Sequence, residues 1–429
     1  MEGKDIHTLS TEFQAAHPEI LVDKKEKFTF DDEKKLVKPH LQDKSSSVVV
    51  CNLQSISSNI EDLVEGYGSQ LKYYYTVEEF AEPTLLELLN KLGFYFNCWT
   101  LGQINACKKA GVPVEKILYL HYSTEETVLR NMKAAGITRS FVDDVNDVQK
   151  FKDFWPEAKL NIQMNIEKET SYGMKCTSFE YAKDICNKAK ELGVTVEGLM
   201  VPAILYNKNA KFVQDYYKSC ADFISWSSDN GHKITEIVIG SDMEMDDPKE
   251  GEEEFCFVEK AKTVSENLKN SFGSLPGLNL YLDVSSTVTE DAFNLYVQVI
   301  GVKQLRDPAE VDPKKVPTVA YYLTEGIYGC LTYFFDTENP EIDYECFNEE
   351  IDKEEDHIKT VLWGPTCDSL DVCKTPADLP KLNVGDWIIF PAIGGQSISL
   401  RSDFNWVEKY TLVYYFADLD VDDEEEVKK

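Results

Sequence analysis

The feature that most constrains the fold is a regular alternation of short apolar runs and amphipathic segments between residues 71 and 283. The apolar runs recur at intervals of roughly 20 to 40 residues, which suits one strand and one helix per unit. Eight runs are predicted to be strands: 71–77, 94–98, 117–120, 139–142, 159–164, 197–202, 234–240 and 278–283. Helical spacing of apolar residues, every three or four positions, marks 84–92, 123–134, 178–192 and 254–272.

Eight such units in about 230 residues match the size of a (β/α)8 barrel, so the sequence predicts a fold of the α/β class with a TIM-type barrel. Apolar periodicity does not reveal whether the sheet closes on itself. A doubly wound open sheet is therefore the alternative.

The pattern changes after about residue 285, where strand-like runs follow one another without long helices. These runs are 293–302, 316–323, 328–335, 360–363, 386–390 and 411–416. They predict a second, all-β domain. The run 47–50 is also strand-like and either precedes the barrel or joins this β domain.

These patterns suggest four regions along the chain. We expect a polar N-terminal segment at 1–45 that packs partly on the β domain, and a barrel at 46–284. The β domain follows at 285–416 and an acidic tail at 417–429.

Charge and composition exclude several classes of function. The formal net charge is −32, which leaves no basic footprint for nucleic acid and repels an anionic membrane surface. No apolar run approaches the roughly 20 residues of a spanning helix. Cysteine and histidine residues show no metal-ligand spacing. We therefore expect a cytoplasmic protein that binds neither nucleic acid, membrane nor metal.

Several motifs resemble the eukaryotic ornithine decarboxylase family. The C-terminal part contains WGPTCDSLD at 363–371 and VGDWIIF at 384–390, which resemble that family's C-terminal domain signature. YYLTEGIYG at 321–329 is similar to its YYVNDGVYG segment, and AGVPVEKILYL at 110–120 to its LGVPPERIIYA. The resemblance implies an alanine-racemase-like barrel followed by a β domain, and an enzyme that uses pyridoxal phosphate.

The cofactor site of that family is altered here. A pyridoxal-phosphate decarboxylase needs a lysine for the Schiff base, an acid at the pyridine nitrogen and donors for the phosphate. The family's lysine position falls on Glu78, and glutamate cannot form an imine. The phosphate-loop glycines fall on Gly240, Ser241 and Asp242. The other positions of the lost site are Asn97, Gln103, Gln163, Pro202, Leu205, Asp283, Ser286 and Gln396.

These changes remove cations or donors from a site that must hold a dianionic phosphate. We therefore expect no bound pyridoxal phosphate, no catalytic residue and no decarboxylation. Asp283 alone keeps an acid that could meet a pyridine nitrogen.

Other family positions are retained. The resemblance places Asp336, Cys367, Asp368 and Tyr328 at positions that face the substrate across a dimer interface. Two interpretations remain open. These residues, with Glu78, could bind a cationic ligand such as a polyamine, or the motif persists because it folds and forms the interface.

The sequence therefore predicts a pseudoenzyme of this family that acts by protein association. It would resemble the antizyme inhibitors, or it would regulate an active decarboxylase as a heterodimer or form a homodimer. The family's antizyme-binding face corresponds to residues 130–159, with basic residues Arg130, Lys133, Arg139, Lys150, Lys152 and Lys159 among added acids. The alternative function is binding or storage of a small cation or polyamine at the remodelled barrel mouth.

Overall fold

The computed structural model of the chain describes residues 6–22, 28–42, 46–122, 124–164, 175–201, 210–240, 257–332, 343–352 and 357–417. The chain divides into two compact units, and the boundaries fall after Phe13, Ser58 and Thr287. The unit that contains residues 59–287 is called the barrel unit, and the unit that contains residues 14–58 and the C-terminal third is called the sheet unit.

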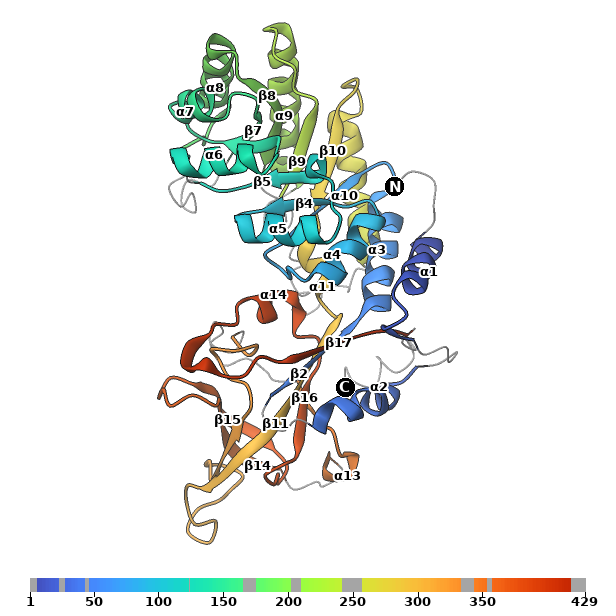
Figure 1. Ribbon diagram of the computed structural model, residues 1–429, viewed down its shortest axis with the longest axis vertical. Coiled ribbons are helices and arrows are strands. Elements are labelled where there is room, and N and C mark those ends of the chain that lie inside the picture. The colour runs from blue at the N-terminus through green and yellow to red at the C-terminus, as the bar shows by residue number, and fades with distance from the viewer. Residues whose placement is uncertain are drawn as a thin grey trace. The chain divides into compact units, whose positions relative to one another are not determined.

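Eight parallel strands close into a barrel in the barrel unit (Figure 1). In barrel order they are β3 (Lys72–Thr76), β4 (Tyr95–Cys98), β5 (Ile117–Tyr119), β6 (Arg139–Val142), β7 (Lys159–Gln163), β8 (Thr195–Val201), β9 (Glu236–Ile239) and β10 (Asn279–Asp283). The last strand pairs with the first, with Tyr281 opposite Lys72 and Asp283 opposite Tyr74. The predicted fold class is thus confirmed in all eight strands, and the open sheet is excluded.

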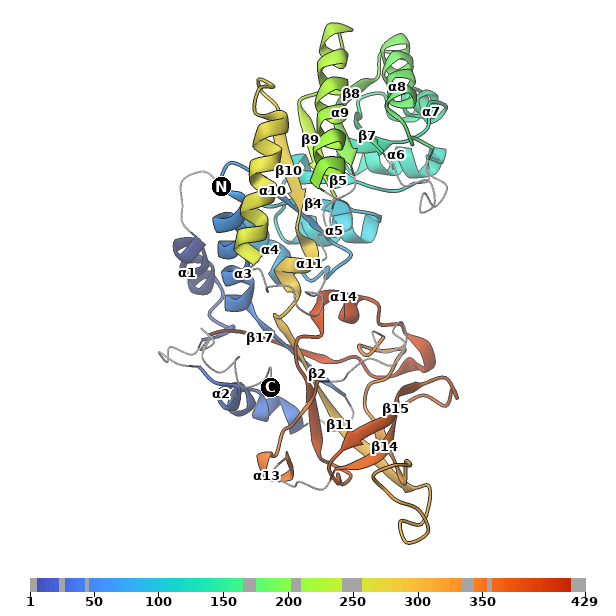
Figure 2. The same ribbon diagram turned by 180° about the vertical axis from the view of Figure 1, so that it is seen from behind.

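Helices lie on the outside of the barrel; the first precedes β3 in the chain, and the others alternate with the barrel strands. They are α3 (Leu53–Tyr67), α4 (Pro83–Lys91), α5 (Leu101–Lys109), α6 (Glu126–Ala134), α7 (Asp147–Phe154), α8 (Phe179–Leu192), α9 (Ala210–Asp229) and α10 (Phe257–Phe272), with a 3-10 turn at Val114–Lys116. Figure 2 shows α9 and α10 side by side on the barrel. Helix α8 illustrates the local signals: the Ser178 hydroxyl accepts a hydrogen bond from the Tyr181 N–H at 3.3 Å, and Gly193 ends the helix with φ +68°.

The barrel interior is packed with apolar side chains. One buried cluster consists of Tyr74, Leu118, Leu120, Phe141, Met200, Val238 and Tyr281, against which Tyr95 and Trp99 pack. The interior of a (β/α)8 barrel is normally a packed core. Here its aromatic content is high, and the Tyr74 ring lies 5.1 Å from that of Tyr281.

A buried ion pair crosses this interior. Arg139 on β6 binds Glu236 on β9, and both side chains are at least nine-tenths buried. Gly198 on β8 makes room for the neighbouring polar group, because a Cβ there would lie 1.7 Å from the Asn161 Oδ1. The pair costs desolvation energy, so its charges stabilise the barrel only while both are present.

The sheet unit contains a nine-stranded mixed sheet. Its main path runs β1 (Leu21–Val22), β17 (Thr411–Phe416), β2 (Val48–Asn52), β11 (Phe293–Gln304), β12 (Val319–Leu323), β14 (Ile358–Trp363) and β15 (Val372–Leu379). Strand β16 (Trp387–Phe390) pairs with β11 and with β13 (Glu345–Cys346). The strand-like run at 47–50 is part of β2, which pairs with β11 and β17 and so lies in this sheet.

The N-terminal region is held on the sheet by a buried glutamate. Glu33 lies on α2 (Phe30–Val37) and accepts hydrogen bonds from the Tyr296 hydroxyl at 2.6 Å and from the Tyr415 hydroxyl at 2.5 Å. The Asn294 amide also donates to this carboxylate, at 3.0 Å. Helix α1 (Ile6–Ala16) precedes α2 in the chain, and a 3-10 turn at Lys38–Gln42 follows it.

The strand expected at 328–335 is wrong for residues 328–332, which form a turn after β12. The N–H groups of Gly329 and Leu331 both donate to the Gly326 carbonyl, which turns the chain. Residues 333–335 lie outside the described residues. Strand β15 was not predicted. Short helices complete the chain: α11 (Ser285–Thr289) spans the boundary after Thr287, and the sheet unit contains α13 (Glu349–Asp352), α14 (Gly394–Ser399) and a 3-10 turn at Phe404–Trp406.

Candidate functional site

The C-terminal ends of the barrel strands, called the barrel end below, are where barrel enzymes place their active sites. Residues at the ends of β3 and β4 and at the start of α11 (Ser285–Thr289) meet there around the Asp283 carboxylate. Its Oδ2 accepts hydrogen bonds from the Thr76 hydroxyl at 2.6 Å and from the Asn97 amide at 2.8 Å. Its Oδ1 accepts from the N–H of Ser285 at 3.2 Å and from the Ser285 hydroxyl.

Asp283 is fully committed to these internal contacts. A carboxylate offers about four acceptor positions, and here four donors occupy them. Burial raises the pKa of Asp283 above its ordinary range, although the bonds from Ser285, Thr76 and Asn97 act in the opposite direction. The acid that the sequence left as able to meet a pyridine nitrogen therefore fixes the ends of β3, β4 and β10 to one another.

Aromatic side chains pack at the same end of the barrel. Trp99 follows β4 and its ring lies 5.8 Å from that of Tyr122, which follows β5. Tyr122 in turn lies 5.3 Å from Phe141. Because Trp99 and Phe141 also pack with the interior cluster, the apolar core of the barrel extends to the strand ends.

Two of the altered family positions serve this packing. The Gln103 side-chain oxygen accepts the N–H of Trp99 at 2.6 Å, at the start of α5. The Gln163 amide donates to the Tyr122 hydroxyl at 3.4 Å. Both side chains thus support aromatic neighbours.

Glu78, the residue at the family's lysine position, follows β3 and is exposed. Gly240 directly follows β9, and its N–H donates to the Val201 carbonyl at 2.7 Å. Ser286 and Gln396 are exposed on α11 and α14. The expected site positions Ser241, Asp242, Pro202, Leu205 and Asp336 lie outside the described residues. In the described part of the chain, no group of three or more histidine, cysteine or acidic residues is placed to hold a metal ion.

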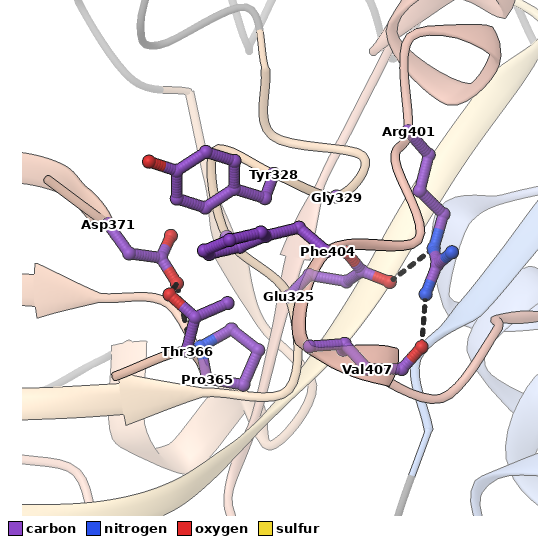
Figure 3. Close-up of a pocket in the computed structure, with 10 residues that line it drawn as sticks. Glu325, Tyr328, Gly329, Pro365, Thr366, Asp371, Arg401, Phe404 and Val407 are labelled. Carbon is purple, nitrogen blue, oxygen red and sulfur yellow. Dashed lines mark hydrogen bonds and ion pairs between the residues drawn. The ribbon is translucent and has the colours of Figure 1, made fainter. Parts of the chain in front are cut away.

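A second organised region lies in the sheet unit and is called the loop face. It consists of segments 325–332, 364–371 and 400–408, which line a small pocket (Figure 3). Three buried charged side chains, Glu325, Asp371 and Arg401, hold these segments in place.

Asp371 joins two of the segments. Its Oδ1 accepts the N–H of Ile327 at 3.0 Å, and its Oδ2 accepts the N–H and the hydroxyl of Thr366 at 2.9 and 2.7 Å. Glycine is required beside it, because a Cβ at Gly326 or at Gly364 would lie 2.2 Å from the Asp371 carboxylate. The close approach of backbone to carboxylate therefore fixes the conformation of both loops.

Glu325 and Arg401 join the remaining segment. Glu325 Oε2 accepts the N–H of Cys330 at 3.0 Å, and its Oε1 lies 3.8 Å from the Arg401 Nε. Burial raises the pKa of Glu325 to about 7, against the opposing effects of the Cys330 N–H and of Arg401. Figure 3 shows the Glu325 carboxylate facing the Arg401 guanidinium, with a dashed line between them.

The retained family positions come together on this loop face. The Tyr328 hydroxyl donates to the Asp368 carboxylate at 2.9 Å, and the Tyr328 ring lies 4.5 Å from that of Phe404. The Asn405 amide donates to the sulfur of Cys367 at 3.4 Å. The structure thus brings together Tyr328, Cys367 and Asp368, and it places Glu78 in the other unit.

The loop face carries exposed apolar side chains around these contacts. They are Leu370, Leu400, Phe404 and Trp406, and Trp406 is 91% exposed. Asn405 and Trp406 both have positive φ, at 54° and 52°. A non-glycine residue adopts such a φ at an energetic cost, which the surrounding contacts must offset.

The sequence interpretation missed Glu325, Asp371 and Arg401. A signal for the two acids was available, because each stands near glycines in the segments EGIYG and GPTCDSLD. Nothing in the pattern around Arg401 distinguishes it from a surface arginine.

The basic residues of 130–159 do not form a free basic face. Arg139 is buried with Glu236, so its expected surface role is wrong. Four others form ion pairs: Lys133 with Glu157, Lys150 with Asp147, Lys159 with Glu197 and Arg130 with Glu126. Acidic neighbours therefore neutralise most of this stretch.

No helix in the described part of the chain is long and apolar enough to span a membrane.

Comparison with known families gives a match over most of the chain. Residues 49–394 match the family described as pyridoxal-dependent decarboxylase, C-terminal sheet domain. Antizyme inhibitor 1 from Pongo abelii is 26% identical over 361 residues, which cover 81% of this chain and 78% of the relative. Ornithine decarboxylase from Schizosaccharomyces pombe is also 26% identical, with the same coverage of the two chains.

Solved structures share the fold. The lysine/ornithine decarboxylase from Vibrio vulnificus, complexed with cadaverine, has a TM-score of 0.74 at 20% identity and covers 90% of this chain and 99% of its own. Lysine decarboxylase from Selenomonas ruminantium has a TM-score of 0.75 at 17% identity, with 92% and 97% covered.

Proposed function

The chain belongs to the pyridoxal-dependent decarboxylase family, and we propose that it is a regulatory member without decarboxylase activity that acts by associating with other proteins. Antizyme inhibitors and ornithine decarboxylases are similar to this chain at about the same sequence identity. Sequence identity alone therefore does not distinguish a regulatory member from an active decarboxylase. The choice rests on the residues of the barrel end and of the loop face.

The described residues of the barrel end do not fit pyridoxal phosphate. Glu78 offers a carboxylate where an imine needs an amine. A pyridine nitrogen needs a free acid acceptor, and the Asp283 carboxylate already accepts four hydrogen bonds from the chain itself. The state of Asp283 is the observation that carries the proposal.

The aromatic packing supports the same conclusion. Trp99, Tyr122 and Phe141 contact one another at the strand ends, and Trp99 packs on the interior core. A planar cofactor at this position would have to displace these side chains, of which Phe141 is buried and Tyr122 is 47% exposed.

The loop face supports association. Exposed apolar side chains that lie together on a soluble surface mark sites of protein contact. Here buried charges hold the loops that present Phe404 and Trp406, so contact residues would be ordered before a partner arrives, which lowers the entropic cost of binding.

We propose a second copy of the chain or an active decarboxylase as the first partners to test, and antizyme as the next. The ion pairs along 130–159 leave little free positive charge for an antizyme contact. The cation-storage alternative receives no support from Asp283, whose acceptor positions are filled.

Co-expression with a tagged active ornithine decarboxylase tests the association. We expect the chain to co-purify with the decarboxylase or to form its own dimer in sedimentation, and Trp406→Ala to weaken the complex at least tenfold. Val384→Ala, at a residue in the sheet unit that is 63% exposed, is the matched control and should leave binding unchanged. A monomer that binds neither the decarboxylase nor antizyme at micromolar concentration contradicts the proposal.

A further inference from the structure

One arginine closes the loop that carries the most exposed tryptophan. The Arg401 side chain is 6% exposed, and its Nη2 donates to the carbonyls of Val407 and Glu408 at 2.6 and 2.9 Å. Its Nη1 donates to the Ser402 carbonyl at 3.1 Å. The guanidinium therefore binds both ends of segment 402–408, which includes Trp406.

The remaining donor of that guanidinium faces Glu325. Within the described part of the chain, Arg401 Nε and Glu325 Oε1 have no hydrogen-bond partner, and they lie 3.8 Å apart as an ion pair. Glu325 is anchored through its other oxygen to the N–H of Cys330. A Cβ at Gly329 would lie 1.6 Å from that oxygen, so the turn is shaped around the carboxylate. The ion pair thus connects segment 402–408 to the turn after β12.

Few other charges act on Glu325. Asp371 faces it from segment 364–371 and disfavours its ionisation, while Arg401 favours it. The thiols of Cys330 and Cys373 also lie in its field, and their own pKa values are raised by burial. The Asp371 carboxylate accepts hydrogen bonds from Ile327 and Thr366. Arg401 is the cation that responds to the charge of Glu325.

We propose that Glu325 and Arg401 form a proton-controlled latch that holds segment 402–408, and with it Phe404 and Trp406, in place on the loop face. With Glu325 ionised, the buried guanidinium has its counter-charge and the segment stays closed. With Glu325 protonated, the guanidinium loses its buried counter-charge and keeps only the exposed carboxylate of Asp403, 3.6 Å from its Nη1, which favours release of Arg401 to water.

The burial of Glu325 raises its pKa to about 7, so the latch changes state near neutral pH. Segment 402–408 should be ordered above this pH and loosened below it. The latch itself needs no partner. Only the further expectation that association weakens at lower pH rests on the proposed function.

Hydrogen exchange of the purified full chain tests the latch. The N–H of Trp406 donates to the Asp403 carbonyl and that of Ser402 to the Tyr328 carbonyl, so peptides over 400–408 report closure directly. One unit above and one unit below the pKa, the ionised fraction differs by roughly tenfold. After correction for intrinsic exchange, we expect the protection of this segment to fall several-fold at the lower pH, while helix α8 stays unchanged.

Two variants isolate the pair. Glu325→Gln should remove the pH dependence and leave the peptides over 400–408 at the lower level of protection. Arg401→Gln removes the cation of the pair and should have the same effect. Glu408→Gln changes an exposed acid on the same segment and should keep the wild-type pH dependence. Near-ultraviolet circular dichroism checks that each variant is folded.

Protection that does not vary with pH in the wild type, or that varies equally in Glu325→Gln, overturns the latch. Partner binding is measured separately across the same pH range. If segment 402–408 opens at low pH while partner binding stays constant, the latch is supported and the segment is not part of the proposed contact.

Discussion

The barrel end and the loop face are each built around a buried aspartate, and they differ in what that aspartate holds. Asp283 accepts hydrogen bonds from Thr76, Asn97 and Ser285 and ties strand ends together. Asp371 accepts hydrogen bonds from Ile327 and Thr366 and holds loops. The first arrangement fills the acceptor positions of Asp283 with donors from the chain itself. The second holds loops that expose the side chains of Phe404 and Trp406.

The proposed association would use the loop face and not the barrel end. Buried carboxylates that accept several hydrogen bonds are costly to disturb in either place. Only the loop face uses that rigidity to present groups to the outside, so changes there should affect association as well as stability. Changes at the barrel end should affect stability alone.

The largest expected effect on stability lies in the barrel interior. Arg139→Met leaves Glu236 buried without its counter-charge, and breaking such a pair typically costs about 3 to 5 kcal/mol. The double variant with Glu236→Met should recover most of this loss. Denaturant unfolding measures both. Arg130→Met, at an exposed ion pair with Glu126, should change stability by less than about 1 kcal/mol.

The next largest effect is expected on the loop face, where a substitution should reduce both stability and partner binding. Asp371→Asn replaces a carboxylate that accepts three hydrogen bonds by an amide with a single acceptor oxygen, which should cost about 2 to 4 kcal/mol. Partner binding should fall at least tenfold, because the loops lose their anchor. Asp378→Asn, at an exposed acid that pairs with Lys359, is the control. Full binding by a folded Asp371→Asn protein would show that the loop face is not the contact.

Asp283→Asn is the matching change at the barrel end. It removes acceptors from Thr76, Asn97 and Ser285 and should cost about 1 to 3 kcal/mol, with no effect on partner binding. If Asp283→Asn weakens partner binding as much as Asp371→Asn does, the claim that only the loop face contributes to association is wrong.

The same variant has a pH signature. Because burial raises the pKa of Asp283 in the folded state, its contribution to stability is greatest below the unfolded pKa and is lost as pH rises through the folded value. Asp283→Asn should remove that fall from the pH dependence of unfolding. An unchanged pH profile would mean that Asp283 does not titrate with a raised pKa.

The smallest expected effect on stability is at Trp406. Its side chain is 91% exposed, so Trp406→Ala should change the free energy of unfolding by no more than about 0.5 kcal/mol. The same variant should nevertheless lose partner binding. A stability loss well above this value would mean that Trp406 is a packing residue.

Much of the fold could be predicted because apolar periodicity reports directly on strands and helices. All eight barrel strands follow from it. Strand β15 was missed because its sequence, VCKTPADL, carries a proline and charged residues that weaken the strand pattern. Residues 328–332 were misread because their apolar side chains are buried in a turn, which the carboxylate of Glu325 and two glycines impose.

The candidate sites could be predicted only in part. The motif likeness identified Glu78 and Asp283 as altered or retained positions, but the hydrogen-bond partners of Asp283 come from strands about two hundred residues away. Their meeting depends on barrel closure and register. The resemblance placed Arg139 on the family's antizyme-binding face, and the structure instead pairs its buried side chain with Glu236.

The central claim is that the barrel end does not hold pyridoxal phosphate. Titration of the purified protein with pyridoxal phosphate, followed by absorbance and by borohydride reduction with peptide mass analysis, tests this directly. We expect no saturable aldimine band and no cofactor fixed to the barrel unit. A saturable band that borohydride abolishes, with the cofactor mapped to a residue of the barrel unit, would contradict the account.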